Sequence, residues 1–225
     1  MYKSYGLSVF LDISTYCNAA CPQCHRTNPN GLDKADWLPL VQWNIDTFKK
    51  AYPLYNSRVR YEAFSFCGTW GDPVMNKDLI DMVEHILKNS NAFVTIDTNG
   101  SIRDEEWWWK LGTIGGERLE VTFAVDGIDQ KMHAHYRRNT NLSKVLDNME
   151  SLSNTMASVK TRTIVFKHNE DYLNDIGNMV KERGATKVFF TPSDRWFYGP
   201  TFKFTDADGK DQKFEKSRIT NEYQM

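Results

Sequence analysis

The feature that most constrains the fold is a repeated alternation of short apolar segments with stretches of helical periodicity. Six apolar segments are predicted strands, at residues 7–13, 60–66, 92–96, 119–125, 161–166 and 187–190. Between them, apolar residues recur at helical spacing over residues 36–52, 77–89, 104–111, 141–156 and 172–183. Because strands that alternate with helices form parallel sheets through right-handed crossovers, we expect an α/β fold, either a barrel or an open sheet.

Polar or reactive residues follow each predicted strand. The third strand ends in Asp97-Thr98-Asn99-Gly100, the fourth in Asp126-Gly127 and the fifth in Lys167-His168-Asn169. In βα barrels the chemistry gathers at the carboxyl ends of the strands. The pattern therefore predicts one shared site at that end of the fold.

Three of the four cysteines lie within eight residues, directly after the first predicted strand. Cys17, Cys21 and Cys24 are spaced C-x3-C-x2-C, and Cys67 is remote in sequence. A structural zinc site takes four ligands, and iron–sulfur clusters are normally held by four cysteines. Three thiolates in one loop suit a four-iron cluster in which one iron stays open to a small molecule. The alternative is a zinc knuckle completed by His25, although adjacent residues chelate one ion awkwardly.

Composition excludes several classes of protein. The 225 residues suffice for one sizeable domain, and 40% apolar with 25% charged residues is ordinary for a globular chain. The net charge of −1 gives no electrostatic case for nucleic acid or an anionic membrane surface. We expect no transmembrane helix, because no apolar run reaches about 18 residues. The polar start at residues 1–6 does not suit a signal peptide, and crowded cysteines favour a reducing cytoplasm.

The cysteine motif resembles the signature of the radical S-adenosylmethionine (radical SAM) enzymes. The resemblance covers about residues 7–193 and implies a partial, laterally open (β/α)6 barrel. It also implies a [4Fe-4S] cluster whose open iron is chelated by the amino and carboxylate groups of SAM. Such a cluster reductively cleaves SAM to a 5′-deoxyadenosyl radical, which abstracts a hydrogen atom from a substrate. An electron donor such as flavodoxin or ferredoxin is the implied partner.

Two segments resemble the SAM-binding motifs of that family. Gly71-Asp72-Pro73 is similar to its Gly-Glu-Pro motif, which receives the SAM amino group. Because aspartate is one methylene shorter, we favour the backbone of Gly71 over the carboxylate of Asp72. In Thr98-Asn99-Gly100, Thr98 or Asn99 would touch SAM, or the segment serves only as a turn.

Two further segments place the chain near one branch of the family. Ala124-Val125-Asp126-Gly127 resembles the Ser-Leu-Asp-Gly of the molybdopterin-precursor cyclase and the SPASM peptide-maturing enzymes, with Ala124 where the branch has serine. Asp126 is then an active-site carboxylate or a loop residue. The resemblance implies Arg137, with Arg138 as the fallback, as the partner of the SAM carboxylate, which a guanidinium binds bidentately.

The chain also departs from the family pattern. Gln23 precedes the last cysteine, where many members have an aromatic residue beside adenine. We therefore expect adenine to pack on backbone groups and on residues near Val165 or Phe190. For Cys67 we favour a buried thiol over a fourth ligand or a radical relay.

We expect a radical SAM core at residues 1–194 and a polar tail at 195–225, with a hairpin over 202–214 that turns at 206–209. The tail holds no further cysteine, so the chain is a stand-alone core or a fragment. The first functional hypothesis is a radical SAM enzyme that acts on a peptide or protein side chain. The alternatives are a small-molecule substrate, a glycyl-radical activating enzyme, and a non-catalytic iron–sulfur or metal-binding module.

Overall fold

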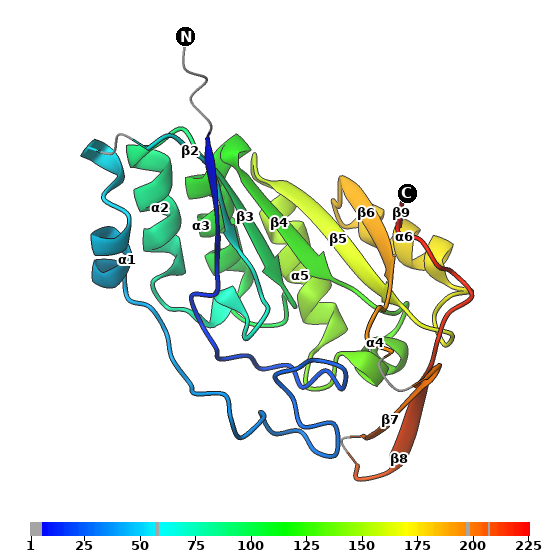
Figure 1. Cartoon of the computed structure of the whole chain (residues 1–225). Helices are drawn as coiled ribbons and strands as arrows, with labels where there is room; N and C mark the ends of the chain where they lie inside the picture. Colours follow the sequence, from blue (N-terminus) through cyan, green and yellow to red (C-terminus); the bar gives the residue numbers. More distant parts are fainter. Residues whose placement is uncertain (1–5, 57–58, 197–198, 207) are drawn as a thin grey trace.

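A mostly parallel seven-stranded sheet organises the molecule (Figure 1). The computed structural model describes residues 6–56, 59–196, 199–206 and 208–225. In order across the sheet, the strands are β1 (Leu7–Leu11), β2 (Tyr61–Phe66), β3 (Phe93–Thr98), β4 (Leu119–Ala124), β5 (Ser158–Val165), β6 (Lys187–Pro192) and β9 (Tyr223–Gln224). The first six pair in parallel, and β1 and β9 form the edges. The expected open α/β sheet with six parallel strands is confirmed.

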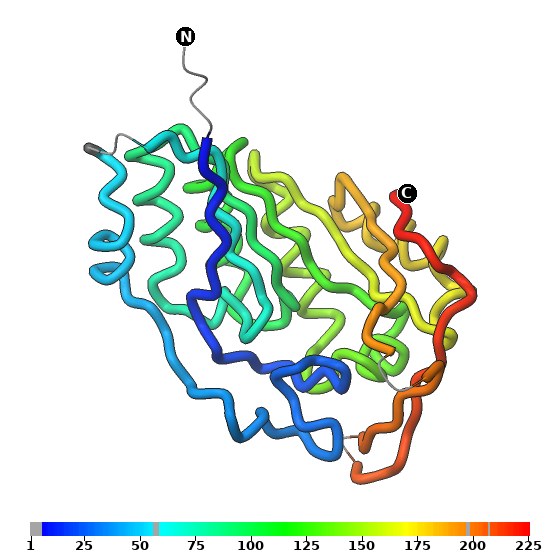
Figure 2. Tube along the Cα trace, in the orientation of Figure 1, coloured from blue at the N-terminus to red at the C-terminus, as the bar shows by residue number. Residues whose placement is uncertain are grey.

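Helices pack against one face of this sheet and leave the other face open, as Figures 1 and 2 show. They are α1 (Ile45–Ala51), α2 (Leu79–Asn89), α3 (Glu105–Gly115), α5 (Leu142–Ser153) and α6 (Leu173–Glu182), with α4 (Gln130–Tyr136) beyond the carboxyl end of β4. Short 3-10 turns are η1 (Leu54–Asn56), η2 (Pro73–Met75) and η3 (Gly116–Arg118). Among the described residues, no helix has the length and apolar character needed to span a membrane.

The core lies between the helices and the sheet because strand side chains alternate between its two faces. Val121 and Phe123 of β4 are fully buried on the helix side, and Phe123 packs against Trp108 of α3. Thr122 lies between them in sequence and faces the open side, where it is half-buried. The open face is therefore the polar face of the sheet.

The helix expected over residues 36–52 is wrong for its first nine residues. Pro39 cannot donate in a helix interior, and it restricts the residue before it. The segment instead runs antiparallel to the end of β1, where Trp43 N donates to Ile13 O at 3.0 Å. The helix begins after Asn44, whose side chain accepts from Thr47 N at 2.8 Å.

The predicted hairpin is present as β7 (Thr201–Thr205) and β8 (Asp211–Glu215), which pair antiparallel. Phe204 and Phe214 of the hairpin are buried, and Phe214 stacks on Phe166 just after β5 with centroids 4.6 Å apart. Position 207 of the expected turn and positions 1–5 of the polar start lie outside the described residues. Two elements were not predicted, α4 and the short strand β9.

Candidate active site

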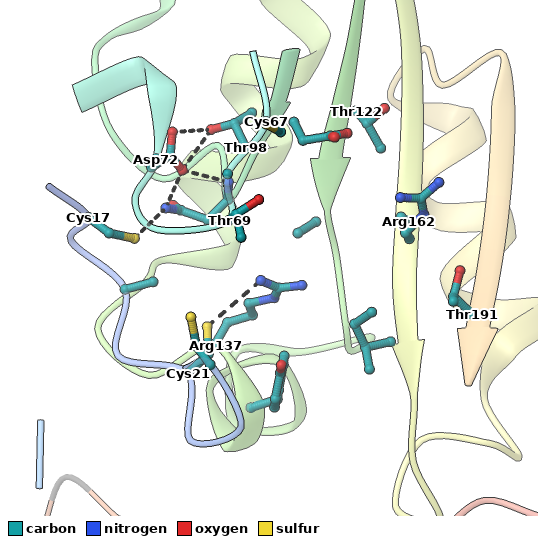
Figure 3. Close-up of a pocket in the computed structure, with 18 of the residues that line it drawn as sticks. Cys17, Cys21, Cys67, Thr69, Asp72, Thr98, Thr122, Arg137, Arg162 and Thr191 are labelled. Atoms are coloured by element: carbon teal, nitrogen blue, oxygen red, sulfur yellow. Dashed lines mark hydrogen bonds between the residues drawn. The ribbon is translucent and has the colours of Figure 1, made fainter. Parts of the chain in front are cut away.

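The carboxyl ends of the parallel strands surround a cavity of about 580 Å³ (Figure 3). The cavity volume suits a small-molecule site. Eight of the predicted site residues line it: Cys17, Cys21, Cys24, Gly71, Asp72, Thr98, Asn99 and Arg137. The ninth, Asp126, is fully buried and hydrogen-bonded to Arg137. The fold therefore brings together residues that are up to 120 positions apart (17 to 137) in the sequence.

The cysteine loop is a set of tight turns that directs its thiols into this cavity. Cys24 N donates to Cys21 O at 3.0 Å, and none of the four cysteines is in a disulfide. Two side chains point N–H groups at sulfur: Asn99 Nδ2 lies 3.8 Å from Cys17 Sγ, and Arg137 Nη1 lies 3.7 Å from Cys21 Sγ. These donors stabilise thiolates, which is the ligand form of cysteine.

Burial raises the pKa of the Cys17 and Cys21 thiols above the ordinary cysteine value. A metal ion reverses this effect, because a coordinating thiol is deprotonated outright. Among the described residues, no three His, Cys, Asp or Glu side chains lie close enough to share a single metal ion. Three thiols that hold a four-iron cluster would lie farther apart than three ligands of one metal ion, since each thiolate would bind a different iron. The three thiols line one cavity, and this donor set fits a four-iron cluster with one iron open to a ligand.

Gly71 lies against the segment that enters the cysteine loop. A Cβ atom at this position would be 2.1 Å from the carbonyl oxygen of Ser14, so no side chain fits. The next residue, Asp72, donates its backbone N–H to Tyr16 O at 2.8 Å. The Gly-Asp-Pro segment is thus held beside the cysteines, with its backbone against them.

The Asp72 carboxylate is already occupied by neighbouring donors. It accepts from Val74 N at 3.0 Å, Thr98 Oγ1 at 3.0 Å, Asn99 N at 2.9 Å and Asn99 Nδ2 at 2.6 Å. Asn99 Nδ2 also donates to Asn18 Oδ1 at 2.9 Å. The carboxylate therefore joins the end of β3 to the cysteine loop, and the protein itself uses the oxygens that a ligand amine would need.

Arg137 is held by a buried ion pair. Its Nε donates to Asp126 Oδ2 at 2.5 Å, and Asp126 Oδ1 accepts from Ile164 N at 2.6 Å. Although burial alone would lower it, the Asp126 carboxylate raises the pKa of Arg137 above its ordinary value, so the guanidinium is charged. Asp126 is therefore a positioning residue that fixes this cation at the cavity.

Arg138, the fallback for the same role, has another function. Its Nε donates to Ala20 O at 2.6 Å, and its Nη1 donates to Thr205 O of the hairpin. Ala20 N in turn donates to Arg138 O at 3.0 Å. Arg138 connects the cysteine loop to the hairpin.

The adenine contacts expected near Val165 or Phe190 stay a prediction, and the structure shows which side chains there face the cavity. Both side chains are fully buried on the helix face, whereas Ile164 and Thr191 line the cavity. A shift of one position along a strand moves a side chain to the opposite face. The sequence of β5 does not reveal this, because its buried row includes Thr161 and Thr163 while the apolar Ile164 faces the cavity.

Gln23 replaces the aromatic residue of many family members with a polar link. Its Oε1 accepts from Ser193 Oγ at 2.7 Å, and its Nε2 donates to Arg195 O at 3.2 Å. Cys67 is half-buried and lines the cavity, with its thiol 3.7 Å from Asp12 Oδ2. Burial raises the pKa of this thiol, which keeps it protonated at neutral pH.

Comparisons with known proteins agree with this geometry. The sequence model of the radical SAM superfamily matches residues 11–180. A probable GTP 3′,8-cyclase from Sulfurisphaera tokodaii is 23% identical over 192 residues, which are 84% of this chain and 57% of that protein. A GTP 3′,8-cyclase from Synechocystis sp. is 21% identical over 175 residues, 76% of this chain and 50% of that protein. The chain spans about half the length of these curated relatives.

Solved structures show the same fold. The match to the structure of native anSMEcpe with bound AdoMet has a TM-score of 0.62 at 17% identity and covers 89% of this chain and 54% of anSMEcpe. The match to Streptococcus suis SuiB bound to precursor peptide SuiA has a TM-score of 0.63 at 12% identity and covers 81% of this chain and 38% of SuiB. Since the family match extends over most of the sequence and includes the three cysteines, the chain belongs to the radical SAM superfamily.

Proposed function

We propose that Cys17, Cys21 and Cys24 hold a [4Fe-4S] cluster and that the adjoining cavity binds SAM, so that the protein is a radical SAM enzyme. One observation carries this proposal: the three thiols and five of the six predicted SAM-binding residues line one cavity. When bound, the cluster and SAM supply a 5′-deoxyadenosyl radical that abstracts a hydrogen atom from the substrate. The fold's part is to position these groups and to exclude water.

The residues of the chain divide this work. The three thiolates bind three irons, and the N–H donors of Asn99 and Arg137 stabilise the negative charge on sulfur. The charged Arg137 guanidinium is the partner for the SAM carboxylate, because it lies beside Cys21 and is fixed by Asp126. The backbone of Gly71 is the proposed partner of the SAM amino group, since the Asp72 oxygens are already hydrogen-bonded.

The substrate that we favour is a peptide or protein side chain. The shared fold with SuiB, whose structure contains a precursor peptide, supports it. A small molecule is the second candidate, favoured by the similarity to GTP 3′,8-cyclases. We further propose a flavodoxin or ferredoxin as electron donor, a cytoplasmic location, and a core at residues 1–194 followed by an extension at 195–225.

The test is anaerobic reconstitution with iron and sulfide, followed by measurement of 5′-deoxyadenosine under dithionite. We expect each of Cys17→Ala, Cys21→Ala and Cys24→Ala to abolish SAM cleavage. Cys67→Ala is the matched control, because this thiol lines the same cavity, and it should retain the cluster. Cluster-loaded protein that never cleaves SAM would instead indicate a non-catalytic iron–sulfur module.

A further inference from the structure

The wall of the cavity opposite the cysteine loop carries charged side chains to which the proposed cofactor chemistry gives no role. Asp97 comes from β3, Arg162 from β5 and Glu222 from the segment just before β9, and all three line the cavity. Figure 3 shows Arg162, with Thr122 and Thr191, across the cavity from Cys17 and Asp72. These positions lie on the open face of the sheet, where side chains point away from the helices.

Asp97 is a carboxylate that faces the cavity with few partners. It lies opposite Thr122 in the β3–β4 register. The Asp97 side chain is exposed to the cavity, and partial desolvation by the surrounding protein raises its pKa, an effect that the positive charges of Arg162 and Lys160 only partly offset. Because the Asp97 carboxylate is exposed to the cavity, a cationic group of a ligand can reach it.

Arg162 is the complementary group. Its Nε is buried and has no hydrogen-bond partner among the described residues. The contact to the Glu222 carboxylate is long, with 4.0 Å between Nε and Oε2, and Glu222 accepts a hydrogen bond from Thr191 Oγ1. A guanidinium has five N–H donors that match a carboxylate, so Arg162 retains capacity for an anionic ligand group.

The balance of charge separates the candidate ligands. Two carboxylates, Asp97 and Glu222, accompany one guanidinium on this wall, and Asp194 and Arg195 add one charge of each sign to the cavity lining. A polyanion such as a nucleoside triphosphate would meet both carboxylates, which costs binding energy. A group with one positive and one negative charge meets a partner for each.

We propose that this wall binds a substrate group in which an ammonium and a carboxylate lie close together, the ammonium at Asp97 and the carboxylate at Arg162. The group comes from a free α-amino acid or from neighbouring lysine and glutamate side chains of a peptide. The assignment rests on the proposed function, because it places the substrate in the cavity that holds SAM.

Binding of two probe series to reconstituted protein with SAM tests this assignment by anaerobic calorimetry. The first series is L-leucine, N-acetyl-leucine, leucinamide and N-acetyl-leucinamide. The second is the blocked dipeptides Lys-Glu, Lys-Gln and Gln-Glu. We expect the doubly charged member of one series to bind about tenfold more tightly than its singly charged relatives, the amount typical of one charge-assisted hydrogen bond. The series that shows the difference identifies the source of the group.

Variants assign each charge to a residue. Asp97→Asn should remove the preference for the ammonium and keep that for the carboxylate, and Arg162→Gln should do the reverse. Glu84→Gln is the control, because Glu84 lies on α2, pairs with Lys88 and is not among the residues that line the cavity. Equal or undetectable binding across both series overturns the proposal. Cluster absorbance and substrate-free SAM cleavage, measured in parallel, show separately whether the variants fold and whether the proposed function holds.

Discussion

At the scale of single residues, the site depends on buried polar groups whose partners come from distant parts of the chain. The cysteine spacing and Arg137 could be predicted, because both belong to local sequence motifs. The pairing of Asp126 with Arg137 and with Ile164 N could not, since it appears only when α4 packs over the end of β5. Likewise, nothing in the sequence indicates that Thr98 and Asn99 already saturate Asp72.

The first prediction concerns the buried pair of Asp126 and Arg137. Asp126→Asn keeps an acceptor for Ile164 N but removes the charge that fixes the guanidinium, so the KM for SAM should rise about tenfold. Cluster content should stay unchanged, which separates positioning from folding. Asp129→Asn is the control, because asparagine caps α4 as well as Asp129 does. An unchanged KM for SAM in the Asp126 variant would rule out the positioning role.

The second prediction concerns Gly71. In Gly71→Ala the new methyl group would collide with the Ser14 carbonyl and push the Gly-Asp-Pro segment away from the cysteine loop. We expect a loss of about 1–3 kcal/mol in the free energy of unfolding and weaker SAM binding, measured by denaturation and equilibrium dialysis. Gly31→Ala, whose methyl would approach no atom closer than 3.8 Å, should bind SAM normally. Equal SAM affinity in both variants would contradict the close approach.

The third prediction is a pH dependence. His133 is fully buried, its Nδ1 accepts from Asp126 N at 3.2 Å, and burial lowers its pKa to about 4. The unfolded chain, with a histidine pKa near 6.5, binds the proton more readily than the folded chain does. The stability is therefore intact above about pH 6.5 and falls as the pH drops toward 4. The shift corresponds to about 3 kcal/mol at most.

Denaturant unfolding at pH 7.5 and pH 5 measures this dependence. His133→Asn should lose less stability between the two values than the native chain does. His168 shares the lowered pKa, also about 4, and keeps its contribution in both proteins. The same loss in both proteins would show that His133 titrates normally in the folded state.

At the scale of elements, the cysteine loop and the C-terminal hairpin form one unit. Arg138 joins Ala20 to Thr205, and Phe204 and Phe214 pack in one cluster with Cys21. The six parallel strands could be predicted because each buries an alternating row against the helices. The helix predicted over residues 36–52 is wrong at 36–44, because Pro39 disfavours a helix there. Helix α4 and β9 are short, and β9 exists through its pairing with β6.

The fourth prediction follows from this unit. Arg138→Ala removes the two hydrogen bonds that join the cysteine loop to the hairpin, so the loop should hold the cluster less firmly. We expect a lower iron content per chain after reconstitution, with secondary structure unchanged by circular dichroism. Arg218→Ala is the control. Arg218 lies in the same C-terminal segment as the hairpin, but it pairs with the exposed Asp171 and not with the cysteine loop. Full iron content in the Arg138 variant would contradict the coupling.

At the scale of the whole molecule, the two faces of the sheet have separate roles. Helices cover one face (Figure 2) and form the main hydrophobic core with it, while polar side chains of the open face line the cavity. Strand alternation predicts an α/β sheet but does not distinguish a closed barrel from an open one. The resemblance to the family predicted an open sheet, and the structure confirms this, because β1 and β9 are edge strands that do not pair with each other. The residues that form the cavity wall could not be predicted, because this needs the register between neighbouring strands, which the sequence does not give.

The central claim is that three thiolates hold a cluster with one iron open to SAM. The most direct measurement is the electron paramagnetic resonance spectrum of the dithionite-reduced, reconstituted protein with and without SAM. We predict a [4Fe-4S]⁺ signal whose g-values change when SAM is added, in the native chain and in Cys67→Ala alike. A signal that SAM leaves unchanged, or a cluster lost only in the Cys67 variant, would contradict the account.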